Sequence, residues 1–134
     1  MTIVLDTNAL ISSIPSSSVF NKIFRDFVNE EYRLAITNEI LSEYFEIMEQ
    51  RSSTLSRNYF EAFFENSQEC FVLIDPQSRY REIYSDEDDN KFVDCAIISF
   101  SKHLVTSDKH ILKQRNEVFY LSCIKPEEYL DLYP

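Results

Sequence analysis

Residues 3–10 read IVLDTNAL, an apolar run that ends abruptly in the carboxylate of Asp6. The run has the length and composition of a buried β-strand. A carboxylate at the end of such a strand costs several kcal/mol unless something compensates it. Asp6 therefore either caps the helix that follows or binds a ligand.

Further apolar runs of strand length recur along the chain and alternate with segments of helical spacing. The remaining predicted strands are Leu34–Ile36, Phe71–Ile74, Leu104–Val105 and Val118–Leu121. The predicted helices cover residues 19–28, 40–48 (N-cap Thr37 or Asn38), 59–64 and 93–100 (N-cap Asp89 or Asn90). This alternation predicts a single domain over residues 1–134, a three-layer α/β/α fold with a central parallel sheet of about five strands.

Composition excludes several functions. The chain has no glycine, which removes the glycine-dependent phosphate loops of P-loop, Rossmann and kinase proteins. Its net charge of −10 opposes nucleic acid at long range, unless divalent cations bridge its carboxylates to phosphates. Three cysteines without CxxC pairing, and two histidines expected at the surface or a strand edge, predict neither a disulfide framework nor a zinc site.

The N-terminus has no signal-peptide pattern, and no apolar run approaches the roughly 20 residues needed to cross a bilayer. We therefore expect a cytoplasmic protein without a membrane partner.

Four acidic residues can meet at one edge of this sheet. Asp6 and Asp108 each follow a predicted strand, and the carboxyl ends of parallel strands form the ligand crevice of open α/β sheets. Asp94 and Glu43, on two helices, can point towards the same crevice. Such an oxygen-rich, anionic pocket suits Mg²⁺ or Mn²⁺ and would support phosphodiester hydrolysis. Taken singly, each acid is also explained as a helix cap, a turn residue or a solvated charge.

Four motifs together resemble the PIN domain family: LDTNALIS, TNEILSEYFEIM, DEDDNKFVDCAI and HLVTSDKHIL. They are most similar to its branch of toxin–antitoxin components related to VapC-type ribonucleases. The resemblance implies a Mg²⁺- or Mn²⁺-dependent nuclease for single-stranded RNA, with Asp6, Glu43, Asp94 and Asp108 as its catalytic and metal-binding acids. Auxiliary positions implied by the same match are Thr7, Asn8, Asp89, Asn90 and Ser107. The family commonly has glycine where this chain has Ser107, which puts the placement of Asp108 in doubt.

Partners are predicted from charge, aromatic content and the same resemblance. Lys91, Lys109 and Lys113 lie close in sequence to the acids and are candidate phosphate contacts for RNA. Eleven Phe and eight Tyr, with Phe60, Phe63 and Phe64 in one stripe, suggest a homodimer through the helices between residues 20 and 64.

The resemblance adds a cognate antitoxin as a further partner. The main alternative is a PIN-fold protein that binds partners and has little nuclease activity. Receiver domains and haloacid-dehalogenase-type phosphatases fit less well, because the chain lacks the second acid that each needs after its first strand.

Overall fold

The computed structural model describes residues 1–75, 87–114 and 121–134, and only the backbone of residues 87–90 and 114. Strands alternate with helices as far as the end of the chain. The order is β1 (Thr2–Leu5), α1 (Thr7–Ser13), α2 (Asn21–Val28), β2 (Arg33–Ile36), α3 (Asn38–Arg51), α4 (Thr54–Asn66), the 3-10 helix η1 (Gln68–Cys70), β3 (Phe71–Leu73), α5 (Glu87–Ile98), β4 (His103–Val105), α6 (Lys109–Gln114), β5 (Ser122–Ile124) and α7 (Pro126–Leu132).

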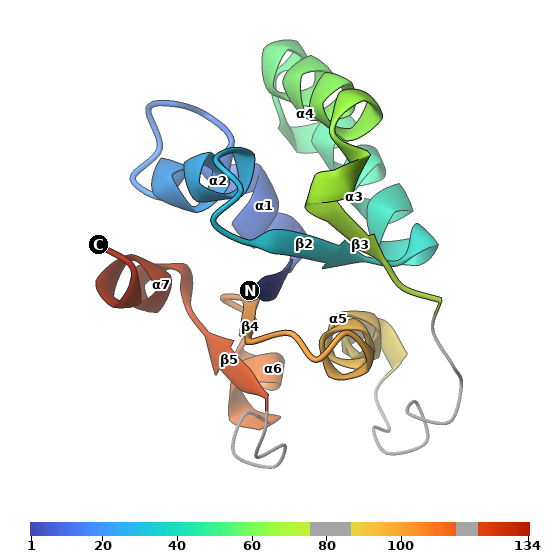
Figure 1. Cartoon of the computed structure of the whole chain (residues 1–134), viewed down its shortest axis with the longest axis vertical. Coiled ribbons are helices and arrows are strands. Elements are labelled where there is room, and N and C mark those ends of the chain that lie inside the picture. Colours follow the sequence, from blue (N-terminus) through green and yellow to red (C-terminus); the bar gives the residue numbers. More distant parts are fainter. Residues whose placement is uncertain (76–86, 115–120) are drawn as a thin grey trace.

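The five strands form one parallel sheet in the order β3-β2-β1-β4-β5, which confirms the predicted three-layer fold. Helices α1 to α4 lie on one side of the sheet, and α5 and α6 lie on the other (Figure 1). The chain leaves β1 towards β2 and β3, then crosses back to β4 on the other side of β1. The strand order therefore reverses between β1 and β4, where a ligand crevice is expected at the carboxyl ends.

The core explains why the strands are apolar without alternation. Ile3, Val4 and Leu5 of β1 are each 0% exposed, because helices cover both faces of the sheet. An aromatic cluster fills the space between α2, α4 and β3, with Phe71 in ring contact with Phe27, Phe60, Phe63 and Phe64. Phe60 is completely buried, and Phe63 and Phe64 are partly buried, so much of this stripe belongs to the monomer's own core.

Two predicted elements are displaced. The last strand is Ser122–Ile124, whereas Val118–Leu121 was predicted; Leu121 precedes the strand, and residues 118–120 lie outside the described part. Ser122 is polar, so the apolar pattern did not indicate that it belongs to a strand. In the structure its hydroxyl lies 3.1 Å from Nδ1 of His103 on the neighbouring strand β4. His103 is buried at the first residue of β4, so of the two placements expected for it the one at the surface was wrong.

Helix α5 begins at residue 87, two or three residues before its predicted caps Asp89 and Asn90. Acidic residues favour the first turn of a helix, so this acidic run starts the helix instead of preceding it. The helix ends before Phe100, which is 84% exposed and has a φ of 54°. Phe100 is therefore not part of the buried stripe.

None of the helices among the described residues is both long and apolar enough to span a bilayer.

Candidate active site at the carboxyl edge of the sheet

A pocket of about 330 Å³ opens at the carboxyl ends of β1 and β4, where the strand order reverses. Asp6, Glu43 and Asp108, three of the four acids predicted to meet, contribute to its wall. The complete lining is Asp6, Thr7, Asn8, Glu43, Lys91, Phe92, Asp108 and Ile111. The fold thus brings together residues from four helices (α1, α3, α5 and α6) and from the junctions that follow β1 and β4.

Asp6 fills the first of the two roles that the sequence left open, that of a helix cap. Its Oδ1 accepts a hydrogen bond from the backbone N–H of Ala9 at 2.7 Å, which makes it the N-cap of α1. Its Oδ2 accepts a hydrogen bond from the hydroxyl of Thr106. Burial raises the pKa of Asp6, and the nearby charge of Asp108 adds to this, while the bonds from Thr106 and Ala9 oppose it. Hydrogen bonds thus fix the position of the carboxylate, and a cation beside it would stabilise its ionised form.

Thr106 is a site residue that sequence reasoning missed. It follows β4, is 0% exposed, and its oxygen also accepts a hydrogen bond from the backbone N–H of Asp108 at 2.9 Å. One hydroxyl therefore connects Asp6 to the Asp108 loop. The available signal was its position: a threonine directly after a buried strand and two residues before a site acid.

Asp108 caps α6, since its Oδ1 accepts the backbone N–H of His110 at 2.7 Å. The doubt about Ser107 concerned a left-handed backbone, which serine tolerates poorly. Among the described residues only Glu30 and Phe100 have positive φ, so Ser107 adopts an ordinary conformation. Its backbone contributes a hydrogen bond that lowers the pKa of Asp6. Serine is therefore compatible with the observed loop.

Glu43 is positioned by the attachment of α3 to β1. The hydroxyl of buried Tyr44 donates to the carbonyl of Leu5 at 2.5 Å, immediately before Asp6. Glu43 accepts a hydrogen bond from the Thr7 hydroxyl on Oε2 and pairs with Nζ of Lys91 at 2.5 Å on Oε1. Partial burial alone would raise the pKa of Glu43, but Lys91 and Thr7 outweigh it and the pKa is lowered. Glu43 is thus held as a carboxylate.

The other predicted residues differ in their placement. Asn8 lines the pocket and is exposed, and Thr7 holds Glu43. Lys109 and Lys113 are exposed on α6, whereas Lys91 is engaged with Glu43. The side chains of Asp89 and Asn90 lie outside the described residues.

Asp94 lies on α5 and is 1% exposed, but it does not line the pocket. Helix α5 packs on β1, β2 and β4, which places Asp94 within the protein interior. Burial raises the pKa of the neighbouring Cys95 to about 12, and the charge of Asp94 contributes to this shift. Of the four predicted acids, Asp94 is the one that the structure keeps away from the pocket surface.

The donors in the pocket fit a hard cation, because carboxylate oxygens are the ligands that Mg²⁺ and Mn²⁺ prefer. Asp6 keeps lone-pair capacity for a cation, because it accepts hydrogen bonds from Ala9, Thr106 and the backbone of Ser107, whereas a carboxylate has about four acceptor sites. The carboxylate oxygens of the three pocket acids do not all lie within 4.8 Å of one another. Within the described residues, the only trio of possible ligand atoms lying within 4.8 Å of one another is Glu30, Glu69 and Cys70.

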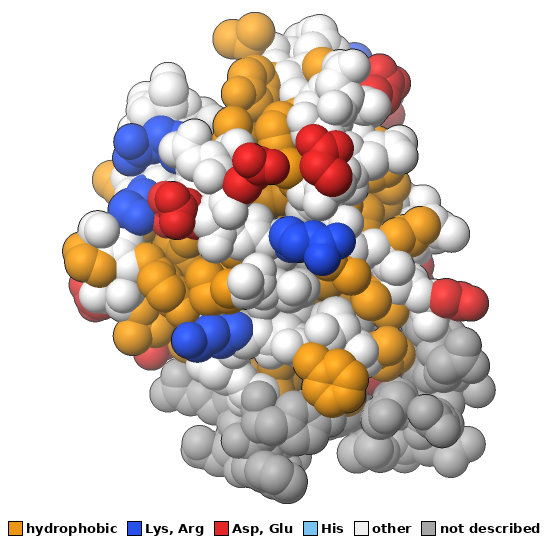
Figure 2. Space-filling view, in the orientation of Figure 1, with side chains coloured by type: hydrophobic (Ala, Val, Ile, Leu, Met, Phe, Trp, Pro, Cys, Tyr) orange, Lys and Arg blue, Asp and Glu red, His pale blue; other side chains and the backbone are white. Residues whose placement is uncertain are grey.

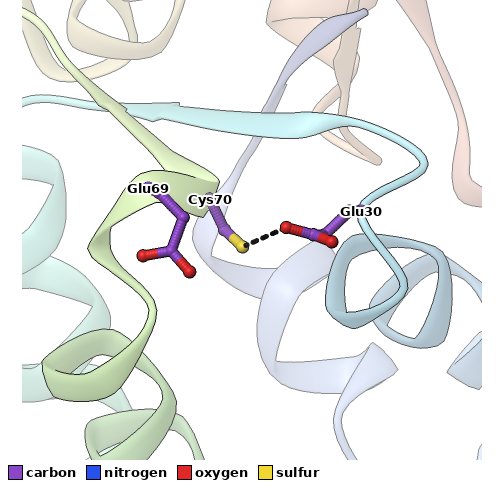
Figure 3. A group of neighbouring side chains, drawn as sticks. All are labelled: Glu30, Glu69 and Cys70. Atoms are coloured by element: carbon purple, nitrogen blue, oxygen red, sulfur yellow. Dashed lines mark hydrogen bonds between the residues drawn. The ribbon is translucent and has the colours of Figure 1, made fainter.

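That trio lies at the opposite edge of the sheet, before β2 and β3 (Figure 3). Glu30 and Glu69 are exposed, and Sγ of Cys70 lies 3.9 Å from Oε1 of Glu30. Burial and the two neighbouring carboxylates raise the pKa of the Cys70 thiol, so it donates to Glu30 as a thiol. It is separate from the pocket at the carboxyl edge.

The surface charge is mixed on the face shown in Figure 2, where acidic, basic and hydrophobic side chains alternate over the described part. The net charge of −10 is therefore not gathered into one patch on this face.

Comparison with known proteins gives a family and a fold. The sequence profile described as PIN domain matches residues 2–110, most of the chain. A similar solved chain comes from the crystal structure of VapBC2 from Rickettsia felis bound to a DNA fragment from their promoter. It is 17% identical, with 93% of this chain and 98% of that chain covered and a TM-score of 0.56. No curated protein matches the sequence.

Proposed function

Because the chain belongs to the PIN domain family, we propose that it is a Mg²⁺- or Mn²⁺-dependent endoribonuclease that cleaves single-stranded RNA. The observation that carries the proposal is the pocket between β1 and β4, where Asp6, Glu43 and Asp108 converge from three parts of the chain. A divalent ion bound there supplies a Lewis acid for in-line displacement at a phosphodiester.

The chain's own residues have distinct tasks in this proposal. Asp6 and Asp108 offer carboxylate oxygens at fixed positions. The N-termini of α1 and α6 hold the two side chains, and Thr106 bonds both the Asp6 side chain and the Asp108 backbone. Burial and the charge of Asp108 both raise the pKa of Asp6, and a cation in the pocket would offset both effects. Lys109 and Lys113, exposed on the helix that Asp108 caps, bind the phosphates that flank the scissile bond.

The biological setting we propose is the toxin of a cytoplasmic toxin–antitoxin pair. The solved structure similar to this chain is described as VapBC2 bound to promoter DNA, and the chain covers 98% of the matched chain. An antitoxin is accordingly the partner we propose, together with a second copy of this chain. The alternative role is that of a partner-binding PIN protein with little nuclease activity. Substitution of the pocket acids, together with a cleavage assay, distinguishes the two roles.

The test is cleavage of a fluorescent single-stranded RNA in Mn²⁺ and in EDTA. Asp6→Asn and Asp108→Asn should each lower the rate by orders of magnitude, and EDTA should abolish cleavage by the parent. Asn can still cap a helix, so both variants should fold. The matched control is Asp131→Asn, which removes an exposed carboxylate on α7 that does not line the pocket. Cleavage that persists in EDTA or in both pocket variants would overturn the proposed metal site, and a parent that does not cleave RNA in Mn²⁺ would leave partner binding as the function.

A further inference from the structure

Lys91 and Glu43 form an ion pair within the wall of the pocket. The atoms Nζ and Oε1 are 2.5 Å apart, and the side chains are only 16% and 29% exposed. Lys91 lies on α5 and Glu43 on α3, so the pair joins helices from opposite faces of the sheet. A contact this short and this shielded is stronger than an ordinary surface pair.

The ion pair occupies Oε1 of Glu43, a residue that lines the pocket. The other oxygen, Oε2, accepts the hydroxyl of Thr7. A divalent ion binds carboxylate oxygen at about 2.0–2.6 Å. An ammonium group already at hydrogen-bond distance from Oε1 would then lie within a few ångströms of that ion, and the two cations would repel each other.

We infer that Lys91 is a built-in competitor of the divalent ion for Glu43. In the metal-free protein its ammonium group neutralises the Glu43 carboxylate, while Asp6 and Asp108 remain open to a cation. Glu43 becomes a ligand only when Lys91 leaves it. Lys91 therefore weakens metal binding and keeps the acidic pocket stable without metal. This role rests on the proposed metal site, and it differs from the phosphate contact expected from the sequence.

The experiment measures Mn²⁺ binding by titration calorimetry, without RNA. Lys91→Met should bind Mn²⁺ on the order of tenfold more tightly than the parent, a factor that corresponds to about 1.4 kcal/mol. Lys109→Met is the matched control, since it removes one exposed positive charge that follows Asp108 in the chain and lies outside the Lys91–Glu43 ion pair. It should tighten binding by less than about threefold, the share due to net charge alone.

A double-mutant cycle isolates the competition for Glu43. In a Glu43→Gln background, Lys91→Met should change the affinity no more than Lys109→Met does. Lys91→Arg keeps the cation and should retain the parent's affinity, and Lys91→Gln replaces Lys91→Met if that variant does not fold.

The outcomes separate this inference from the metal site itself. A parent that binds Mn²⁺ with equal effects of Lys91→Met and Lys109→Met overturns the competition and leaves the metal site standing. Absence of Mn²⁺ binding in all of these proteins overturns both the metal site and the competition.

Discussion

The hydroxyl of Thr106 donates a hydrogen bond to the carboxylate of Asp6, although the two residues are 100 positions apart in the chain. Since the same hydroxyl accepts the backbone N–H of Asp108, it aligns the ends of β1 and β4. Thr106→Val keeps the shape and removes the hydroxyl. We expect metal affinity and RNA cleavage to fall by about 10- to 100-fold and the free energy of unfolding to fall by about 1–3 kcal/mol.

Thr106→Ser provides the control, because it restores the hydroxyl without the methyl group. It should recover most of the Mn²⁺ affinity measured by calorimetry. If Thr106→Val binds Mn²⁺ as tightly as the parent, the hydroxyl contributes to stability alone.

Asp94 can be tested as a metal ligand through stability. Asp94→Asn removes a buried negative charge at nearly constant shape, so in EDTA the variant should melt at the same temperature as the parent or higher. Mn²⁺ should raise the melting temperature of the parent by mass action, and this gain should shrink in the variant. Differential scanning fluorimetry with each additive gives the four melts. Equal gains in parent and variant would show that Asp94 is not a ligand.

The lowered pKa of buried His103 predicts that the protein loses stability in mild acid. Burial lowers its pKa from the ordinary value of 6.5, with the charge of Lys102 adding to the effect, and Nε2 lies 2.7 Å from the hydroxyl of Tyr133. Between the folded and unfolded pKa values the unfolded chain binds more protons. The free energy of unfolding should therefore fall as the pH drops below about 6.5.

Urea titrations between neutral and mildly acidic pH measure this loss. His103→Gln keeps hydrogen-bonding capacity without titrating, so it should flatten the pH dependence. His110→Gln, at an exposed position on α6, should leave it unchanged.

The homodimer proposed from the aromatic content has a definite surface to test. A groove of about 440 Å³ runs between α2 and the start of α4, lined by Phe24, Leu55 and Tyr59 among others. Leu55 is 80% exposed there. Leu55→Glu should convert a dimer to a monomer by light scattering at micromolar concentration. Leu132→Glu, at another exposed leucine on α7, should not. A monomeric parent contradicts the homodimer.

The sequence reveals the parts of the site that local pattern encodes. Asp6 and Asp108 are predictable because each follows an apolar run, and the parallel sheet brings such positions together. The ion pair of Lys91 with Glu43 is not, since it depends on how α3 and α5 pack at the pocket. Thr106 escaped notice for a similar reason, because its partner lies at the other end of the chain.

Because the chain has no glycine, Glu30 after α2 and Phe100 after α5 adopt the left-handed conformation that glycine usually takes at helix ends. Phe100 has a φ of 54°, and the bonds from Phe100 N to Ile97 O (3.2 Å) and from Ser101 N to Ala96 O (3.0 Å) form a Schellman motif. A left-handed backbone costs a residue with a Cβ about 1–2 kcal/mol. Phe100 is 84% exposed and loses little packing when replaced. Phe100→Gly should therefore raise the free energy of unfolding by about 1 kcal/mol in urea titrations. Ser52→Gly, after α3 at a φ of −105°, should give no such gain, because glycine has no advantage there. A stabilisation by Ser52→Gly as large as that by Phe100→Gly would contradict the strain.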